Sequence, residues 1–493
     1  MKVVLIAPPL MDYVEGILQP IAMDATRECP PYGIYLLASV LRRAGHEAVV
    51  LDLILQGSGR LSAFWPEIAS CQLIGIGSSS LSWPTARDCI NEIRRCRQDV
   101  PIVLGGIHAT MFDAHVLATT AADFVIRGEG ERSLCELCRC LGSGLDVRSV
   151  PSLTFKNSDG SIVRNPAAPK MTMDELSSLP VPDYGQIPSG IYSGLGVESS
   201  RGCPFDCLFC STSYRRTWRG IQPERFVDRL EQVLPHIAQT RNAIVQIIDD
   251  EFSVKPQRAI AICQEIGRRG LRPKLVFDCR ANDLLNEALV QAIAPYTHQF
   301  LVGAECGYDD GLRRVGKGTT IEKLEKAAVV LARHGIAAKA DFSFILGLPW
   351  ETRREVETTA RFACRLYSKY GVRVLLQWYC QIPGSRLWQE SRDSENVHEA
   401  QYDDYGFFRN LYLFRTGVQL TPREIAEVSE ILSPVIALSS LLSPEKRLVE
   451  YANPEPIRRF FPSPLPGCRD GAGLARLREV AGIRDQETNH TPE

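Results

Sequence analysis

Residues 199–210 read Ser199-Ser200-Arg201-Gly202-Cys203-Pro204-Phe205-Asp206-Cys207-Leu208-Phe209-Cys210. Three cysteines stand in this stretch with the spacing CxxxCxxC, and the aromatic residue Phe209 precedes the last of them. Three thiolates on one short loop can hold three irons of a cubane iron–sulfur cluster and leave the fourth iron without a protein ligand. Such an open iron can bind a small molecule and pass an electron to it.

Other uses of cysteine fit this stretch less well. Sixteen cysteines in 493 residues produce some close pairs by chance, and buried cysteine often packs as a small hydrophobic residue. A disulfide framework is not expected, because the chain is long and shows no secretory signal. A zinc site usually requires a fourth cysteine or histidine nearby, and the twenty residues after Cys210 contain neither. The spacing therefore favours an iron–sulfur site.

Length and composition indicate a globular protein of two or three domains. Hydrophobic residues make up 45% of the chain and charged residues 23%, which are ordinary values. The net charge of −2 supplies no general basic field for nucleic acid, and no apolar run approaches the length that spans a bilayer. Many thiols without an export signal indicate a reducing compartment. We therefore expect a cytoplasmic protein with no nucleic-acid partner and no membrane span.

Residues 1–145 alternate short apolar segments with amphipathic ones, which is typical of a parallel α/β sheet. An expected helix, Gly33–Ala44, lies between the first two strands and has Gly45 as its C-cap. Because the apolar runs are continuous rather than alternating, we expect a sheet that is covered on both faces. The predicted strands are Val3–Ala7, Ala48–Leu53, Leu73–Gly77, Ile102–Gly105 and Phe124–Ile126.

Small or polar residues follow these strands. Pro8-Pro9 follow the first, Ser78-Ser79-Ser80 the third, Gly106-Ile107-His108-Ala109 the fourth and Gly128-Glu129-Gly130-Glu131 the fifth. In doubly wound sheets, ligands bind outside the carboxyl ends of the strands, where glycine lets the backbone approach closely. Each turn taken alone can equally be an ordinary turn, but the set indicates a ligand site.

Residues 146–190 are rich in proline, serine and aspartate, contain an expected hairpin around Asn157–Gly160, and are interpreted as a linker between domains. A second βα pattern begins at Gly194, with helical stretches that include Glu224–Ile237, Arg258–Arg269 and Ile321–His334. Six βα units fit a partial TIM-type barrel, whose active site lies at the carboxyl ends of the strands. The predicted strands are Gly194–Glu198, Ala243–Ile248, Lys274–Asp278, Phe300–Ala304, Ala338–Ile345 and Val372–Trp378.

Charged and turn-forming residues gather at the ends of these strands. Asp249 and Asp250 end the second strand, Arg280 follows the third, Glu305 ends the fourth, and Leu346–Pro349 follow the fifth. Charged groups at apolar strand ends are costly unless they are paired or bind a ligand. A structural layer of ion pairs at the barrel mouth is the alternative interpretation for any one of them.

Together these motifs resemble the cobalamin-dependent radical S-adenosylmethionine (SAM) enzymes. The cysteine spacing with its aromatic residue resembles the radical SAM domain, and the segments APP, PPYG, GGIHAT and RGEGE resemble the cobalamin-binding domain found in front of many such enzymes. The resemblance covers roughly residues 1–390, and its motifs occur in the expected order. It implies a doubly wound, Rossmann-like (flavodoxin-like) cobalamin domain at 1–145, the linker at 146–190 and a partial (β/α)6 radical SAM barrel at 191–390.

The resemblance implies metal ligands and contacts to SAM in the barrel. Cys203, Cys207 and Cys210 match the ligands of the [4Fe–4S] cluster, whose open iron binds SAM. Glu305 matches a carboxylate that contacts the SAM ribose, and Arg280 a position near the SAM carboxylate or in a supporting salt bridge.

Two further sets of barrel residues match the family, the first only by its position in the barrel and the second within a single turn. Asp249 and Asp250 stand where the family places its second-strand SAM motif, although the GGE form of that motif is missing. Gly347 and Pro349 match a turn near adenine.

The resemblance also implies a cobalamin site at the carboxyl edge of the first sheet. Many other cobalamin proteins carry a DxHxxG loop after the first strand, and the nearest match here, Asp113-Ala114-His115, lacks the glycine and follows the fourth strand. We therefore expect no histidine ligand on the lower face of cobalt. The expected cobalamin-binding residues are Ser78, Ser80, Gly105, Gly106, His108, Gly128 and Glu129.

The cofactors imply a reaction. In the family, the reduced cluster cleaves SAM to methionine and a 5′-deoxyadenosyl radical, which takes hydrogen from an unactivated substrate carbon, and that carbon then receives the methyl group of methylcobalamin. We expect a class B C-methyltransferase acting on a small-molecule intermediate of natural-product biosynthesis, served by an external electron donor of the flavodoxin or ferredoxin type. The main alternative is a cobalamin-dependent radical SAM cyclase, or an enzyme that rearranges or oxidises a ring.

Two other classes fit poorly. A methylthiotransferase acting on transfer RNA needs three further cluster cysteines in its N-terminal domain and normally a basic tail, and neither is visible. A non-catalytic cobalamin sensor would lack the complete set of cluster cysteines.

Some segments have no assigned chemistry. Cys135, Cys138 and Cys140 fall in an expected helix, Arg132–Leu141, and are interpreted as packing residues rather than metal ligands. Residues 391–493 are expected to be a mostly helical region that shapes the substrate site, followed by a tail. Within it, Tyr402–Phe408 can line a pocket or pack a lid, and Thr421–Leu442 begins as a helix capped at Thr421.

Overall fold

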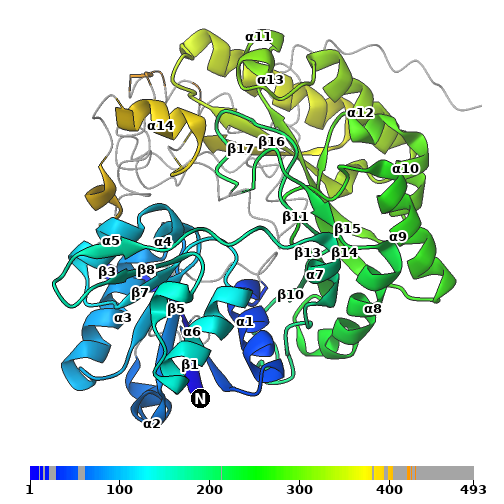
Figure 1. Cartoon of the computed structure of the whole chain (residues 1–493). Coiled ribbons are helices and arrows are strands. Elements are labelled where there is room, and N and C mark those ends of the chain that lie inside the picture. The colour runs from blue at the N-terminus through cyan, green and yellow to red at the C-terminus, as the bar shows by residue number, and fades with distance from the viewer. Residues whose placement is uncertain are drawn as a thin grey trace, which may run out of the picture. The chain divides into compact units, whose positions relative to one another are not determined.

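The computed structural model describes residues 1–9, 11–14, 17–20, 29–53, 61–212, 214–379, 382–393, 398–403 and 419–421, with Glu424 and Val428 (Figure 1). The chain divides into two compact units. Unit 1 consists of Met1–Gly202, Cys210–Ile248 and Ile382–Phe408, and unit 2 of Cys203–Phe209, Asp249–Gln381 and Arg409–Glu493. The domain boundaries drawn from the sequence stay predictions.

The N-terminal sheet is doubly wound. It runs in the order β4 (Glu47–Asp52), β1 (Lys2–Ala7), β5 (Leu73–Gly77), β6 (Ile102–Gly105), β7 (Phe124–Ile126), β8 (Leu153–Lys156), β9 (Ile162–Arg164). The first five strands in this order pair in parallel, and counted along the chain their order is 2-1-3-4-5, as in flavodoxin. All five predicted strands are confirmed, with ends displaced by at most one residue.

The predicted hairpin is also confirmed, and it extends this sheet. The Asn157 N–H donates to the Ser161 carbonyl at 2.8 Å, and Gly160 takes a φ of +83° at the turn. Strand β8 pairs antiparallel with β7, and its Leu153 and Phe155 are buried in the core. The first part of the segment interpreted as a linker therefore belongs to the sheet.

One face of the sheet is covered by α1 (Tyr32–Arg43) and α6 (Glu131–Ser143). Gly45 follows α1 with a φ of +84°, as the predicted C-cap requires. Cys138 and Cys140 are buried in this core and Cys135 packs against it, so their interpretation as packing residues is confirmed. The other helices of unit 1 are α2 (Trp65–Ser70), α3 (Trp83–Cys96), α4 (Ile107–Met111), α5 (Asp113–Thr119), α7 (Met173–Ser178), α8 (Pro223–Val233) and α14 (Arg386–Asp393).

The second large sheet has the six strands of the predicted partial barrel. It runs in the order β10 (Gly194–Val197), β13 (Ile244–Ile247), β14 (Lys274–Arg280), β15 (Thr297–Glu305), β16 (Ala340–Leu346), β17 (Arg373–Trp378). Strand β10 pairs with β13 in parallel, and β14 to β17 pair in turn in parallel. All six strands were predicted, with ends displaced by a few residues. The helices of unit 2 are α9 (Pro256–Arg268), α10 (Glu287–Ile293), α11 (Asp309–Arg314), α12 (Ile321–Arg333) and α13 (Arg353–Tyr370).

Two short ribbons complete the description of the strands. The first joins β2 (Met11–Val14) to β3 (Ile17–Pro20), and the second joins β11 (Ser200–Arg201) to β12 (Arg219–Gly220). In the described part of the chain, no helix is both long and apolar enough to cross a bilayer.

The C-terminal region is described only in part. Thr421 and Glu424 form a reciprocal cap, in which the Thr421 N–H donates to the Glu424 carboxylate at 2.8 Å and the Glu424 N–H donates to the Thr421 hydroxyl at 3.3 Å. This pair confirms Thr421 as a helix cap. Residues 404–408 and most of the predicted helix Thr421–Leu442 lie outside the described residues.

Candidate cofactor sites

The turns after β5 and β6 meet at the carboxyl edge of the N-terminal sheet. Gly106 has a φ of +90°, and a Cβ added there would lie 2.4 Å from the carbonyl oxygen of Ser78. Only glycine fits this position. The His108 N–H donates to the same Ser78 oxygen at 3.3 Å. The structure thus brings three of the predicted cobalamin-binding residues together.

The His108 imidazole is fully buried at this edge. Its Nδ1 lies 3.0 Å from the Ser80 hydroxyl oxygen, and its ring stacks on Trp83 with centroids 4.6 Å apart. Burial and the neighbouring His115 lower the pKa of His108 to about 3, so the ring is neutral near pH 7.

Two buried polar atoms at this edge have no partner among the described residues, namely the His108 Nε2 and the Ser78 hydroxyl oxygen. Buried polar atoms are normally hydrogen-bonded, because leaving them unsatisfied is costly. Their presence beside a glycine that allows close backbone approach fits the predicted binding of a polar cofactor such as cobalamin.

The Asp113 carboxylate is occupied by other contacts. It accepts hydrogen bonds from Thr154 at 2.6 Å and from Arg164 at 2.5 Å. The His115 Nε2 lies 3.6 Å from a carboxylate oxygen of Asp403 but makes no hydrogen bond within the described residues. The contacts of Asp113 give its side chain a structural role on α5, which agrees with the interpretation of this DxH match as accidental.

Glu129 lies in a buried ion network. Its carboxylate contacts Arg219 at 2.7 Å and Arg201 at 3.3 Å and accepts the Met171 N–H at 2.8 Å. Burial would raise the pKa of Glu129, but these partners lower it. The preceding Gly128 has a φ of +76°. Sequence reasoning placed Glu129 at the cobalamin edge, and the structure adds that its carboxylate is committed to two arginines.

The cysteine loop runs from β11 to β12. Gly202 precedes Cys203 with a φ of +85°, and a Cβ there would lie 2.2 Å from the Thr217 carbonyl oxygen. The Cys207 thiol is buried and lies 3.9 Å from the Gly316 carbonyl oxygen, while the Cys210 sulfur accepts the Thr212 N–H at 3.5 Å. The loop is therefore closed at its base by a glycine that no other residue can replace without a shift.

No disulfide forms among the cysteines of the described residues. Within those residues, no three histidine, cysteine or acidic side chains are grouped for a single metal ion. A cubane cluster does not require such a group, because each thiolate binds a different iron. The assignment of Cys203, Cys207 and Cys210 as ligands stays a prediction.

Arg280 and Glu305 contact a residue that sequence reasoning missed, Lys317. The Lys317 ammonium lies 2.6 Å from the Glu305 carboxylate, and both are buried. Arg280 donates to the Lys317 carbonyl oxygen, and its guanidinium lies over the ring of Phe205, 3.5 Å from the centroid. Arg280 thus holds the middle of the cysteine loop.

The backbone of β15 is shaped to accommodate the ion pair between Glu305 and Lys317. Glu305 ends β15 with a φ of +62°, and a Cβ on Gly303 would lie 2.3 Å from the Lys317 nitrogen. Burial would lower the pKa of Lys317, but Glu305 and the Cys207 thiol raise it. The lysine therefore supplies a positive charge beside Cys207. A lysine between two glycines, Gly316-Lys317-Gly318, was the available sequence signal.

The structure separates the two predicted acids after β13. Asp249 is buried, whereas Asp250 is exposed. The next residue, Glu251, stands in the same group at the strand end but was given no cofactor role from the sequence, and it is buried. The Ser253 hydroxyl oxygen lies 2.6 Å from the Glu251 carboxylate and 2.7 Å from the Asp283 carboxylate. Burial raises the pKa of Glu251 to about 8, and the Asp283 charge adds to this rise.

The turn Gly347–Pro349 is held by Glu351, which sequence reasoning also missed. The Glu351 carboxylate accepts the N–H groups of Gly347 and Leu348 at 2.7 and 2.9 Å, and the Tyr308 hydroxyl at 2.9 Å. Burial raises the pKa of Glu351 to about 7, although these hydrogen bonds oppose the rise. The predicted adenine turn therefore has a fixed backbone.

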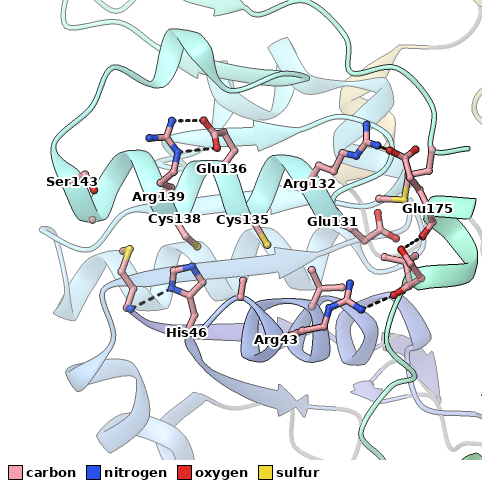
Figure 2. A pocket seen from close by; sticks show the side chains of 17 residues that line it. Arg43, His46, Glu131, Arg132, Cys135, Glu136, Cys138, Arg139, Ser143 and Glu175 are labelled. Carbon is pink, nitrogen blue, oxygen red and sulfur yellow. Dashed lines mark hydrogen bonds and ion pairs between the residues drawn. The ribbon is translucent and has the colours of Figure 1, made fainter.

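A groove of about 880 Å³ opens elsewhere in unit 1, between α1, α6 and α7 (Figure 2). Several of its charged side chains pair with one another or with the backbone: Arg139 with Glu136, Arg132 with Glu175, and Arg43 with the Ser178 carbonyl. Glu131, which also lines the groove, pairs with Arg201. Burial raises the pKa of the Cys138 thiol to about 12, so that thiol is unreactive. The groove shows no feature of a cofactor site.

Two family models match the chain. The radical SAM superfamily matches residues 197–363, and the B12 binding domain matches residues 19–138. The chain belongs to the cobalamin-dependent radical SAM family. Its cofactors are therefore a [4Fe–4S] cluster, SAM and cobalamin, as the sequence predicted.

Relatives of this radical SAM protein differ in their named activities. A protein of Pyrococcus horikoshii, named an uncharacterized methyltransferase, is 28% identical over 79% of this chain and 83% of its own length. The anaerobic magnesium-protoporphyrin IX monomethyl ester cyclase of Rubrivivax gelatinosus is 27% identical over 77% of this chain and 69% of its own. The solved structure of the methyltransferase TsrM from Kitasatospora setae, with cobalamin and a [4Fe–4S] cluster bound, matches with a TM-score of 0.62 and 19% identity, covering 80% of this chain and 75% of that one. This structural likeness confirms the predicted fold.

Proposed function

We propose that this protein is a radical C-methyltransferase that moves a methyl group from SAM, by way of cobalamin, to an unactivated carbon of a small molecule. The observation that carries the proposal is the presence, in one chain, of a glycine-closed cysteine loop and a sheet edge with two unpartnered buried polar atoms. When bound, the cluster and SAM supply hydrogen-abstracting radical chemistry, and cobalamin supplies a transferable methyl group.

The residues of the barrel have distinct roles in this proposal. Cys203, Cys207 and Cys210 hold the cluster. Arg280 fixes the loop through Phe205, and Lys317 places a positive charge beside Cys207. A fixed cation there offsets the negative charge that thiolate ligands bring into a buried site.

The remaining barrel residues orient SAM. Glu305 is held in one position by Lys317, so that its carboxylate is oriented before the ribose arrives. Glu351 holds the backbone of Gly347 and Leu348 for adenine. Preorganisation of this kind reduces the conformational entropy that is lost when a ligand binds.

The residues of the sheet edge hold cobalamin. His108 offers its Nε2 and Ser78 its hydroxyl, while Gly105, Gly106 and Gly128 leave room for close approach. Because the lowered pKa keeps His108 neutral, it can donate or accept one hydrogen bond without bringing a buried charge.

A cyclase is the second candidate, and the similarity to the Rubrivivax enzyme favours it. The alignment with the Pyrococcus horikoshii methyltransferase covers 83% of that protein's length, against 69% for the Rubrivivax cyclase, so methyl transfer is preferred here. We also propose an electron donor of the flavodoxin or ferredoxin type, because no chemistry in the described residues regenerates a reduced cluster.

One half-reaction separates the two candidates without knowledge of the substrate. Anaerobically reconstituted protein is given reduced cobalamin and SAM, and methylcobalamin and S-adenosylhomocysteine are quantified together. A methyltransferase forms both in equal amounts. If neither forms in protein that retains its cluster and its cobalamin, and 5′-deoxyadenosine alone accumulates under reducing conditions, the methyltransferase proposal is wrong and the cyclase is favoured.

A further inference from the structure

The base of the cysteine loop is a two-stranded ribbon that carries two arginines opposite each other. Strand β11 pairs antiparallel with β12, and Arg201 is the direct partner of Arg219. Arg201 is followed by Gly202 and Cys203, so it is two residues before the first predicted cluster ligand. Contacts that hold these two arginines in place therefore also hold the base of the loop in place.

Three carboxylates surround these arginines. Arg201 contacts Glu131 at 2.6 Å, Glu129 at 3.3 Å and both oxygens of Glu198, while Arg219 contacts Glu129 at 2.7 Å. We call this group of five residues the Arg201 network: Glu129, Glu131, Glu198, Arg201 and Arg219. The side chains of all five are 12% exposed or less.

The network is geometrically specific. The Arg201 guanidinium donates to three different carboxylates from separate nitrogens of its planar fork, whereas lysine would have to make these contacts from a single nitrogen. Removing one partner of a buried ion pair is strongly destabilising, because it leaves the other charge uncompensated. The Arg219 guanidinium also lies 5.0 Å from the centre of the Tyr214 ring, which is itself part of the loop.

Two of the carboxylates come from the cobalamin edge. Glu129 and Glu131 belong to the turn after β7, at the carboxyl end of the doubly wound sheet, where such sheets bind their ligands. Figure 2 shows Glu131 at the N-terminal end of α6. The same turn therefore borders the expected cofactor and holds the base of the cysteine loop.

We propose that the Arg201 network couples the cobalamin edge to the cysteine loop. In this proposal Arg201 is the positioning residue: when the turn after β7 shifts, Arg201 shifts the base of the loop that holds the cluster. The proposal rests on the proposed function in one respect, namely that Cys203, Cys207 and Cys210 hold the cluster. A shift of the turn on cofactor binding moves two carboxylates, and the ribbon that carries Arg201 and Arg219 must follow, since neither arginine can leave a buried partner uncompensated.

The test uses the full chain with its reconstituted cluster. The midpoint potential and the electron paramagnetic resonance (EPR) spectrum of the reduced cluster are measured with and without bound cobalamin. Cluster potentials respond to charge, hydrogen bonding and solvent exposure around the sulfurs. We expect cobalamin to shift both readouts in the native protein.

Two variants remove the coupling in different ways. Arg201→Lys keeps the charge but loses the fork, and Glu131→Gln keeps the shape but loses one carboxylate charge. Both are expected to lose most of the cobalamin-dependent shift while they retain iron content and cobalamin binding. Glu136→Gln is the matched control, because Glu136 lies on the same helix and pairs with the exposed Arg139. It should keep the full shift.

The outcomes are distinguishable. A native protein that binds both cofactors and shows no cobalamin-dependent shift overturns the coupling, as do Arg201→Lys and Glu131→Gln proteins that keep the native shift. If Arg201→Lys does not fold, Glu131→Gln decides alone. Failure of the proposed function looks different: the cluster would then persist when the three cysteines are replaced by alanine, whatever the network does.

Discussion

At the scale of single residues, one serine hydroxyl bridges two acids at the carboxyl ends of the barrel strands. The Ser253 hydroxyl lies within hydrogen-bond distance of both Glu251 and Asp283, but it has only one proton to donate. The second contact requires that one carboxyl group carries a proton. This geometry agrees with the raised pKa values of both acids, for which burial is the largest cause.

The raised pKa of Glu251 makes the free energy of unfolding depend on pH. The pKa of Glu251 rises from 4.5 to about 8 on folding, so its contribution is full below the lower value and is lost as the pH rises through the higher one. We expect Glu251→Gln to become more stable relative to the native protein as the pH rises across this window, by at most about 1.4 kcal/mol per pH unit.

Urea unfolding of the full chain at several pH values measures this effect. Glu322→Gln is the control, since Glu322 is exposed and pairs with Lys326. A constant difference between Glu251→Gln and the native protein across the window would show that Glu251 is ionised in the folded state throughout.

Gly106 makes a second prediction at this scale. Gly106→Ala combines a left-handed backbone with a Cβ placed 2.4 Å from the Ser78 oxygen, so we expect it to lower the free energy of unfolding by about 1–3 kcal/mol. It should also weaken cobalamin binding, because the turn must shift. Gly105→Ala is the matched control, since a Cβ there meets no atom within 4 Å. Equal unfolding free energies for the two variants would contradict this account of the turn.

At the scale of elements, the segment after β17 packs onto the helices of the cobalamin edge. Tyr402 is buried and stacks on Phe112 with centroids 5.4 Å apart, and its hydroxyl accepts the Trp388 indole N–H at 2.7 Å. His108 lies edge-on to Tyr402 at 6.1 Å. The sequence left open whether Tyr402 lines a pocket or packs, and the structure shows packing.

This packing predicts a graded response to truncation. Tyr402→Phe removes one hydrogen bond and should cost about 0.5–1.5 kcal/mol of unfolding free energy. Tyr402→Ala also opens a cavity and should cost about 3–5 kcal/mol. Denaturant unfolding followed by tryptophan fluorescence measures both, because Trp388 reports on the same contact. Similar losses for the two variants would mean that the ring contributes little packing.

Elements could be predicted well from the sequence, but contacts between distant residues could not. Strands β1 and β16 were found because they are apolar runs that end in small residues. In contrast, the pairing of Glu305 with Lys317 depends on the fold of α11, and that of Glu129 with Arg219 on the position of the β11–β12 ribbon. The hydrophobic periodicity and the composition of a sequence do not show which distant residues pair.

The barrel acids show the same limit. Sequence reasoning chose Asp249 and Asp250 by their place after an apolar strand, yet Glu251 is the acid that faces Asp283 through Ser253. Asp249 and Glu251 are both buried, whereas Asp250 between them is exposed. The direction of a strand-end residue is therefore decided by the following turn, which the sequence did not reveal.

At the scale of the whole molecule, the chain order places a cobalamin domain before a radical SAM barrel, and the cysteine loop connects the two units along the chain. Its base belongs to unit 1, whereas Cys203–Phe209 belong to unit 2. The Arg201 network fixes the base, and Arg280 fixes the middle of the loop through Phe205.

The cluster content of the anaerobically reconstituted chain tests the central claim most directly. Iron, sulfide and the EPR signal of the reduced cluster are measured for the native protein, for the Cys203→Ala/Cys207→Ala/Cys210→Ala variant, and for Cys263→Ala, whose buried cysteine lies on α9. We predict a SAM-responsive cluster in the native protein and in Cys263→Ala, and none in the triple variant. A triple variant that still assembles a cluster whose signal responds to SAM would contradict the account.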